Sequence, residues 1–402
     1  MNHLFIIAGL RTPFIRMGTD FDGLSAADLG QSVSSALLTR TGIDPALISE
    51  VIFGCVAQPA DSANLARIIA LRSGIPDFVP AATVHRNCAS GMEAITTAHQ
   101  RMSAGKGDLF LVGGTESMSQ IPLFYSHTAA KKFAALGRAK SLPARLKALT
   151  SFRPRDFKPR VGLQLGLTDP FSGLNMGQTA EVLAREYDIT REQQDAFAAS
   201  SHQKALAARH ALAQEIAPVY HNGKAITEDN GIRTDSTPEK LSTLKPVFDR
   251  LTGTVTAGNS SQITDGAVAL LVGNEAAVRK LGIDPLGRLV SYAYAGCDPA
   301  RMGLGPLHAI ARCGIEPAEA DVIEINEAFA AQVLSVLKIQ HLDPAKINRH
   351  GGAIALGHPV GATGARLVLT ALHQLRATQG RRALASLCIG GGQGAALWLE
   401  RP

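Results

Sequence analysis

Short runs of apolar residues alternate along the chain with longer stretches in which apolar positions recur at helical spacing. Three such runs, 109–112, 322–325 and 383–387, are rich in Val, Ile and Leu and have the length of strands. Strands of this kind that alternate with helices form sheets whose two faces are both covered by helices. The pattern therefore predicts an α/β protein with buried, mostly parallel sheets.

The chain carries an internal duplication. Residues 42–54 resemble residues 314–325. Further on, Cys88-Ala-Ser-Gly91 opens a predicted helix that leads to a strand and a Gly-Gly pair, and Gly361-Ala-Thr-Gly364 opens the same series. Because the order of helix, strand and turn recurs, we expect two similar α/β halves.

The duplication sets the expected domain boundaries. The N-terminal half would span 1–274 and the C-terminal half 275–402. Within the N-terminal half, an insertion over 119–254 would separate the core segments 1–118 and 255–274. The insertion is predicted to be mostly helical.

Two segments of the insertion have the clearest helical pattern. Residues 179–187 follow Met176-Gly177, and residues 191–210 follow Thr190, a residue type that caps helix N-termini. We expect both segments to be helices.

The basic residues concentrate in one segment, 131–160. The chain has a net charge of +6, yet this segment alone holds ten Lys and Arg residues against one acid, Asp156. Apolar residues recur in it at helical spacing, with Pro143 as a break, which predicts short, basic, amphipathic helices. Such helices would dock on an anionic membrane or an acidic partner. The alternative is a solvated lid, and nucleic-acid binding is disfavoured because no aromatic stacking platform accompanies the charge.

Composition excludes several classes of protein. The chain is 402 residues long and 46% hydrophobic, which excludes disorder over its bulk, and it has no run of 18 apolar residues that would span a membrane. Its first residues are too quickly charged for a signal peptide. The five cysteines include no CxxC pair, so they form neither a disulfide scaffold nor a metal site and fit a cytoplasmic protein.

Cys88 is the first candidate for chemistry. It lies between a predicted strand, 81–87, and a predicted helix, 92–102. The N–H groups and dipole of a helix N-terminus favour a thiolate and would lower the pKa of the thiol. The residues that follow it are small, so a substrate can approach closely, as a nucleophile requires. The alternative is a buried cysteine that acts as a small apolar residue.

His358 lies in a glycine-rich stretch, 351–364, where backbone can approach a ligand and imidazole is the natural base near neutral pH. A structural role in the turn is the alternative. Because Gly361 occupies the place of Cys88 in the repeat, the two strand-to-helix turns would face a shared centre.

Two further residues follow predicted strands. Cys388 ends one strand and precedes Ile389-Gly-Gly-Gly-Gln-Gly394, whose glycines would expose its thiol. A thiol with a pKa of about 8.5 donates or accepts a proton at modest cost. Asn326 follows the strand 322–325 and would supply an amide to hold a water or a carbonyl oxygen.

Four sequence blocks together resemble the signatures of the thiolase family, in family order and spacing. The resemblance runs from Arg11-Thr-Pro13 to the C-terminus, and the four blocks are Asn87-Cys-Ala-Ser-Gly91, Asn326-Glu-Ala-Phe-Ala330, Gly357-His-Pro-Val-Gly-Ala-Thr-Gly364 and Cys388-Ile-Gly-Gly-Gly-Gln-Gly394. It implies a thiolase-like duplicated α/β core with five layers, α-β-α-β-α, and an inserted, mostly helical loop domain. It also implies coenzyme A as a substrate and no permanently bound cofactor or metal.

The resemblance implies a role for each matching residue. Cys88 would be the acyl-accepting nucleophile, His358 the base that activates Cys88 and later the coenzyme A thiol, and Cys388 the acid/base at the α-carbon of acetyl-CoA. Asn326 would hold a water that forms one oxyanion hole with His358, and the N–H groups of Cys88 and Gly390 would form the other. The substrate and coenzyme A contacts implied are Arg233, Ser261, Met176, Met302 and Phe329.

The branch of the family is less sharply marked. Asn175 and Gln393 depart from the residues common in acetoacetyl-CoA thiolases, and the basic segment resembles the β-subunit of the trifunctional β-oxidation complex. In that subunit, however, a His stands at the position of Asn326. The resemblance favours a degradative 3-ketoacyl-CoA thiolase, a homodimer or homotetramer, with a short-chain acetoacetyl-CoA thiolase as runner-up. A non-catalytic acyl-CoA carrier is disfavoured because both cysteines and the histidine are present.

Overall fold

The computed structural model describes residues 3–402, which form two compact units. The core unit comprises the chain up to Gln120 together with Asp169–Pro402, and the hairpin unit comprises Ile121–Thr168. The predicted insertion, 119–254, therefore contributes residues to both units. No helix among residues 3–402 is both long and apolar enough to cross a membrane.

One ten-stranded sheet runs through the core unit, in the order β12-β13-β14-β11-β1-β10-β5-β3-β4, with β2 paired to β10. The strands are β1 (Phe5–Arg11), β2 (Ile15–Arg16), β3 (Glu50–Gly54), β4 (Ala81–Val84), β5 (Leu109–Glu116), β10 (Thr264–Gly273), β11 (Gly287–Gly296), β12 (Val322–Ile325), β13 (Arg382–Ile389) and β14 (Gln393–Glu400). The two halves of the sheet meet at β1 and β11, which pair over two residues only.

The expectation of mostly parallel strands is wrong. Only β3–β4, β3–β5 and β12–β13 are parallel, and the remaining pairs are antiparallel. The physical reason is clearest at β13 and β14, which a three-residue glycine turn joins directly. Without a crossover helix, the chain can only return antiparallel to the strand it has left.

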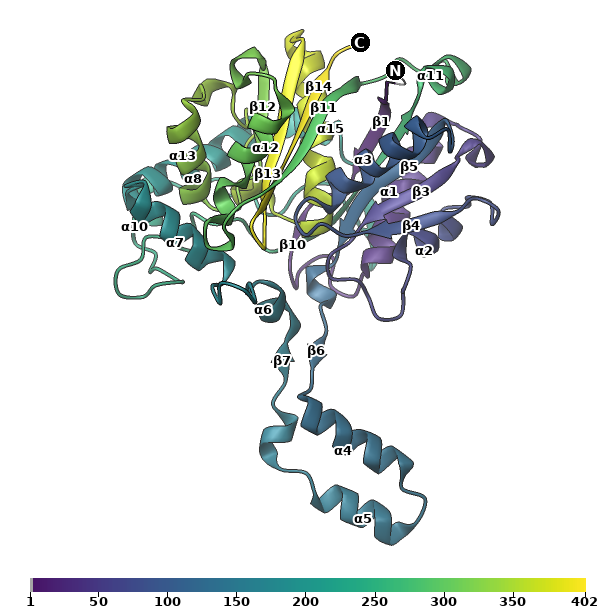
Figure 1. Ribbon diagram of the computed structural model, residues 1–402, viewed down its shortest axis with the longest axis vertical. Coiled ribbons are helices and arrows are strands. Elements are labelled where there is room, and N and C mark those ends of the chain that lie inside the picture. The colour runs from purple at the N-terminus through teal and green to yellow at the C-terminus, as the bar shows by residue number, and fades with distance from the viewer. Residues whose placement is uncertain (1–2) are drawn as a thin grey trace. The chain divides into compact units, whose positions relative to one another are not determined.

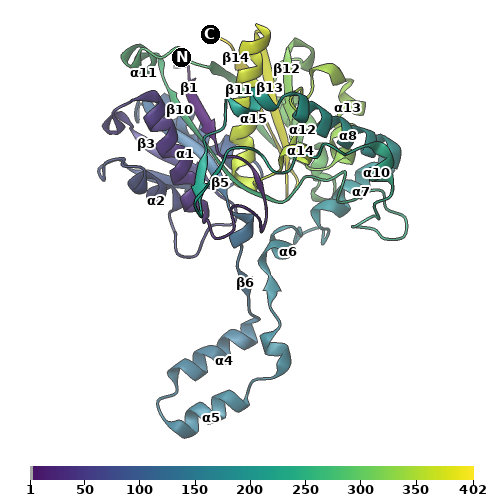
Figure 2. The same cartoon turned by 180° about the vertical axis from the view of Figure 1, so that it is seen from behind.

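The helices of the core unit lie in three layers around the two sheet halves (Figures 1 and 2). Helices α1 and α2 cover the outer face of the N-terminal strands, α3 and α15 lie between the halves, and α12 and α13 cover the outer face of the C-terminal strands. These helices are α1 (Ala26–Thr41), α2 (Leu65–Arg72), α3 (Ser90–Ser103), α12 (Gly305–Cys313), α13 (Ala330–Gln340) and α15 (Val360–Thr378). The predicted α-β-α-β-α layering is confirmed.

The predicted duplication is visible in the order of elements. Helix α1 ends at a left-handed Gly42 and leads through a short 3-10 turn, Pro45–Leu47, to β3. Helix α12 ends at a left-handed Gly314 and leads through Pro317–Glu319 to β12. Further along, α3 leads to β5 as α15 leads to β13.

The rest of the core unit is mostly helical. The predicted helix 179–187 begins earlier, at Met176, because Asn175 and Gln178 form a capping box there. The predicted helix 191–210 divides into two helices, and Thr190 caps the first of them as expected. The elements are α7 (Met176–Glu186), α8 (Arg191–Ala207), α9 (Arg209–Ala213), β8 (Val219–His221), β9 (Lys224–Ile226), α10 (Pro238–Ser242), α11 (Glu275–Leu281) and α14 (Ala353–Leu356).

The hairpin unit contains the basic segment, and its predicted short helices are confirmed. Helices α4 (His127–Arg138) and α5 (Leu142–Thr150) are capped by Ser126 and Ser141, and α6 spans Gly162–Gly166. Strands β6 (Leu123–Phe124) and β7 (Arg160–Val161) pair antiparallel at the base of the unit. Four aromatic rings of this unit pack on one another, those of Tyr125, Phe133, Phe152 and Phe157.

Candidate active site

Cys88 lies in the tight turn between β4 and α3. Asn87, directly before it, has a positive φ of 43° and donates from Nδ2 to the Gly390 carbonyl over 2.7 Å. Ser90 closes the turn by donating from Oγ to the Asn87 carbonyl. The N–H groups of Cys88 and Gly390 both point at the Cys88 sulfur. The turn therefore fixes the thiol against the glycine turn that follows β13.

The pKa of the Cys88 thiol is raised above its usual value, chiefly by burial, and the two backbone N–H groups only partly oppose this. The expected lowering of this pKa is therefore wrong. Desolvation penalises a thiolate more than one helix terminus stabilises it. The resting sulfur is a protonated thiol, and it needs a base to become a nucleophile.

His358 precedes α15 and is held through both ring nitrogens. Its Nδ1 lies 2.6 Å from the Thr363 hydroxyl, and its Nε2 lies 3.4 Å from Asn326 Nδ2. The Thr363 hydroxyl gives its one proton to the Pro359 carbonyl, so it accepts from Nδ1–H. This hydrogen-bond network assigns the tautomer in which Nε2 carries the lone pair.

The pKa of His358 is lowered to about 4, chiefly by burial and in smaller part by the Arg366 guanidinium. The imidazole is therefore neutral at pH 7. A neutral imidazole whose Nε2 carries the lone pair is equipped to accept a proton.

Cys388 lies inside β13, where its Cα pairs with Gly394 of β14. Only 1% of its surface is exposed, so the expectation that glycines expose the thiol is wrong. The strand continues one residue past Cys388, and the glycine turn starts only after it. Burial raises the pKa of Cys388 well above its usual value, and the neighbouring Cys88 raises it further, so deprotonation is not the modest cost that the sequence suggested.

The two central helices bring the Cys88 and His358 turns together. They touch at glycines near their N-termini: a Cβ on Gly91 of α3 would lie 2.6 Å from the Ala365 nitrogen, and a Cβ on Gly364 of α15 would lie 2.7 Å from the Met92 nitrogen. Neither position has room for a side chain. The expected shared centre between the two half-repeats is present in the fold.

Asn326 follows β12 and is completely buried. Its Oδ1 receives no hydrogen bond from any residue in the described range 3–402. A buried carbonyl oxygen without a donor is rare in folded proteins and is suited to a bound water or substrate group.

An apolar cluster borders Cys388. It contains Met302 and Phe329, which are buried, and Met176, whose sulfur lies 3.1 Å from the position of a Cβ on Gly390. The ring of Phe248 packs edge-on against Phe329 with a centroid distance of 5.9 Å. Three of the predicted substrate contacts are therefore grouped beside the predicted acid/base.

The other two predicted contacts are held by their backbones. Ser261 donates its N–H to the Ala328 carbonyl over 2.9 Å, which places it next to Phe329. Arg233 donates its N–H to His202 Nδ1 over 3.2 Å, and its side chain is exposed. The structure does not bring Arg233 into contact with the apolar cluster.

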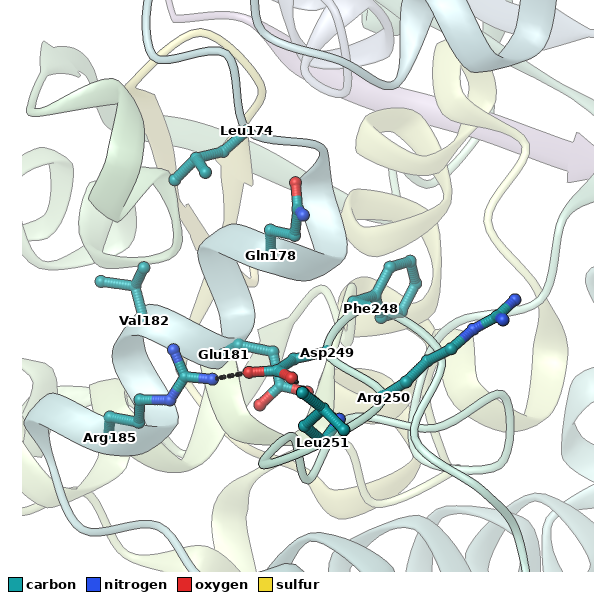
Figure 3. Close-up of a pocket in the computed structure, with 9 residues that line it drawn as sticks. All are labelled: Leu174, Gln178, Glu181, Val182, Arg185, Phe248, Asp249, Arg250 and Leu251. Atoms are coloured by element: carbon teal, nitrogen blue, oxygen red, sulfur yellow. Dashed lines mark hydrogen bonds and ion pairs between the residues drawn. The ribbon is translucent and has the colours of Figure 1, made fainter.

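A cavity of about 500 Å³ opens between α7 and the loop 248–251 (Figure 3). Leu174, Val182 and Leu251 line it together with Phe248, and Arg185 pairs with Asp249 at its edge. Phe248 belongs both to this cavity and to the apolar cluster beside Cys388.

Sequence reasoning missed three residues of this arrangement. Thr363 orients His358, Asn87 ties the two turns together, and Phe248 extends the apolar cluster. Two of these residues could have been found from the sequence. Thr363 lies in the first turn of the helix after His358, and Asn87 lies directly before Cys88. Phe248 lies in a loop between Arg233 and Ser261 and belongs to none of the four sequence blocks, so the sequence gave no signal for it.

Within residues 3–402, no group of three or more His, Cys, Asp or Glu side chains is arranged to hold a metal ion. Cys55 is buried and donates to Glu116, and Cys297 and Cys313 are partly buried and lie in no motif.

Comparisons with known proteins identify the family. Residues 4–276 match the model of the thiolase N-terminal domain, and residues 283–401 match that of the thiolase C-terminal domain. The chain is 40% identical to a 3-ketoacyl-CoA thiolase of Pectobacterium carotovorum, over 99% of this chain and 97% of the relative. It is 41% identical to a probable acetyl-CoA acetyltransferase of Escherichia coli, over the full length of both.

Solved structures agree with this identification. Human mitochondrial 3-ketoacyl-CoA thiolase in complex with CoA superposes with a TM-score of 0.90 at 36% identity, covering 100% of this chain and 98% of that one. The chain belongs to the thiolase family of acyltransferases.

Proposed function

We propose that the protein is an acetyl-CoA C-acyltransferase, which cleaves a 3-ketoacyl-CoA with coenzyme A to acetyl-CoA and a shortened acyl-CoA in fatty acid β-oxidation. The observation that carries the proposal is the close contact of α3 and α15 near their N-termini, from which we infer that the Cys88 thiol and the neutral His358 imidazole meet, with the Cys388 thiol near enough to Cys88 for Cys88 to raise its pKa. Two thiols and one base are the groups that this reaction needs.

In the first half-reaction, Cys88 gives its proton to Nε2 of His358, and the thiolate attacks the 3-keto carbon. The bond between the α- and β-carbons then breaks. The acyl group stays on the sulfur of Cys88 as a thioester, and the electron pair leaves as the enolate of acetyl-CoA. Cys388 protonates the α-carbon of that enolate, and the proton on His358 then passes to the Cys388 thiolate, so that both residues regain their starting forms.

In the second half-reaction, a new coenzyme A thiol gives its proton to His358 and attacks the thioester. Cys88 leaves as a thiolate, which the N–H groups of Cys88 and Gly390 stabilise, and His358 then returns its proton to Cys88. The same two N–H groups stabilise the oxyanion of the tetrahedral intermediate. The buried Oδ1 of Asn326 would hold a water that, with His358, binds the enolate oxygen.

The substrate contacts follow the apolar cluster. Met176, Met302 and Phe329 would line the acyl chain, and Ser261, beside Phe329, would contact pantetheine. The exposed Arg233 would pair with phosphates of coenzyme A. The human relative solved in complex with CoA supports coenzyme A as the second substrate. The proposal includes no resident cofactor. We keep the division into two thiolase halves, 1–274 and 275–402, as part of the proposal.

The second candidate is a short-chain acetoacetyl-CoA thiolase, which relatives named acetyl-CoA acetyltransferase support. Steady-state thiolysis of 3-ketoacyl-CoA substrates from C4 to C16 separates the two. The degradative enzyme is expected to have its highest kcat/KM above C4. A maximum at C4 with negligible turnover of C10 and longer substrates would favour the second candidate instead.

We also propose that the enzyme is a cytoplasmic homodimer or homotetramer whose hairpin unit binds an anionic membrane or a β-oxidation partner subunit. Leu142, Leu146 and Leu149 follow one face of α5 and are each more than half exposed. The same helix carries the exposed Arg145 and Lys147, so anionic lipid would attract it and the leucines would insert shallowly.

Vesicle co-sedimentation over a salt series tests this docking surface. Four exposed basic residues, Lys131, Arg138, Lys140 and Lys147, are reversed to Glu, and Lys132 is left because it pairs with the nearly buried Asp156. The variant is expected to lose salt-sensitive binding to anionic vesicles, while its C4 thiolysis rate stays unchanged. Binding equal to wild type would remove the membrane as the partner.

A further inference from the structure

A buried ion pair lies next to the two groups that hold His358. Arg366 of α15 donates from Nη1 to Glu324 Oε2 of β12 over 2.7 Å, and both side chains are 0% exposed. Thr363 lies three residues before Arg366 on the same helix, and Asn326 lies two residues after Glu324, just past the end of the same strand. Residues at these spacings share a face. The pair thus joins α15 to β12 beside the points from which these two segments hold the imidazole.

Stability does not account for this pair. Two further guanidinium nitrogens, Arg366 Nε and Nη2, donate to no acceptor within the described residues. Isolating charges from water is expensive, and a well-packed apolar pair of similar volume is often at least as stable. An ion pair that costs free energy of folding in this way indicates a role at the candidate active site.

The orientation of Glu324 is fixed from its other side. Its Oε1 accepts from Gln374 Nε2 over 2.8 Å. The pKa of Glu324 is raised to about 7, chiefly by burial and less by Glu327 and Glu215, against the attraction of Arg366. The Arg366 guanidinium also acts on His358, because it lowers the pKa of the imidazole in the same direction as burial.

We propose that the Arg366–Glu324 pair is a positioning element for His358, which sets the separation between Thr363 and Asn326 so that Nε2 faces the Cys88 thiol. The proposal rests on the function proposed above, in which His358 is the base. Neither member of the pair touches substrate, because both are fully enclosed.

The decisive variant is the double substitution Arg366→Met with Glu324→Gln. It removes both charges and keeps an acceptor for Gln374. We expect kcat to fall roughly 10- to 100-fold, the loss typical of a misplaced catalytic group, while KM for coenzyme A changes less than about 2-fold. Alkylation of Cys88 by iodoacetamide should slow in parallel, and Arg366→Lys should recover part of the rate.

Thr370→Val is the matched control. Thr370 is also buried on α15, and it donates to Glu215 rather than toward β12. We expect its kcat and Cys88 alkylation to match wild type, even where its thermal midpoint falls. If the double variant fails to fold, the single variants Arg366→Lys and Glu324→Gln decide the question against this control.

A folded double variant with wild-type kcat and a wild-type pH profile would overturn the inference. His358→Asn, measured beside it, separates the two levels of the argument. If His358→Asn is inactive and the double variant fully active, only the positioning role is wrong. If His358→Asn turns over like wild type, the proposed function itself is wrong.

Discussion

In each half of the core unit, the end of one strand contacts the start of the central helix that belongs to the other half. The two contacts differ in the groups that meet there. At the end of β5, the Glu116 carboxylate accepts the Gly361 N–H at the start of α15 over 2.9 Å. After β13, the Gly390 N–H points at the sulfur of Cys88, just before α3. One contact is a carboxylate saturated by backbone, since Val56 and Ala57 also donate to Glu116. At the other contact, the hydrogen-bonding capacity of the Cys88 thiol is not fully used.

The difference shows how a duplicated scaffold divides its work. The geometry of strand end and helix start is common to both halves, because both must pack the same central layer. The contact at which the N–H group faces the reactive sulfur serves the chemistry. The contact at which the N–H group binds a fully hydrogen-bonded carboxylate serves stability. Substitutions at the two contacts should therefore fail in different ways.

The largest effect is expected at the reactive contact. Cys88→Ser should lower thiolysis by at least about 1,000-fold, because a hydroxyl is a far weaker nucleophile and leaving group than a thiolate. The thermal midpoint should stay close to wild type. Cys313→Ala, which removes a partly buried thiol outside every motif, is the matched control and should keep its activity. Turnover of Cys88→Ser near the wild-type rate would show that the contact at Cys88 is not the reactive one.

Cys388→Ala should separate the two half-reactions. Exchange of the α-proton of acetyl-CoA into deuterated water should fall roughly 100- to 1,000-fold, since a general acid/base has been removed. Acylation of Cys88 should continue slowly, because His358 still activates the nucleophile. Normal deuterium exchange in this variant, followed by mass spectrometry of acetyl-CoA, would show that another group serves the enolate.

The pH dependence of stability sharpens the role of His358. Its pKa falls from 6.5 unfolded to about 4 folded, so the neutral form stabilises the native state above pH 6.5. That contribution is lost as the pH falls from 6.5 through about 4, and it amounts to about 3 kcal/mol. His358→Asn should therefore lose less unfolding free energy than wild type over this range. Parallel denaturant titrations at pH 7 and pH 4.5 measure the difference, and identical pH slopes would contradict it.

The smallest effect is expected at the saturated contact, and it is one of stability. Glu116→Gln should lower the free energy of unfolding by about 2 kcal/mol, because the three N–H groups donate to both carboxylate oxygens and an amide has only one oxygen to accept them. Once folded, the variant should keep its kcat within about 3-fold of wild type, since the carboxylate touches no reacting atom. A loss of kcat with an unchanged free energy of unfolding would show that the Glu116 contact serves catalysis and not stability.

Much of this architecture was readable from the sequence. The repeat of Gly42 to Gly54 after Gly314 predicted two halves, and the turns at Cys88 and His358 predicted a shared centre. Helix starts at Thr190 followed from capping chemistry. These features depend on interactions between residues that are close together in the sequence.

The remaining features depend on long-range packing. The antiparallel strands follow from a direct turn after β13 and from the return of β10 beside β5, which strand composition does not reveal. The pKa shifts of Cys88 and Cys388 were misjudged because burial depends on the whole fold and outweighs a helix terminus. Arg366, an ordinary helix residue in the sequence, became notable only because Glu324 lies opposite it.

The central claim is that Cys88 carries the acyl group and that His358 activates it, and rapid-quench peptide mapping tests this most directly. Wild-type enzyme and His358→Asn are mixed with acetyl-CoA, quenched over a time series and digested, and the acetylated peptide is located by mass spectrometry. We predict one acetyl adduct, on Cys88, that forms at least about 100-fold more slowly in the variant. An adduct on any other residue, or equal rates in the two proteins, would contradict the account.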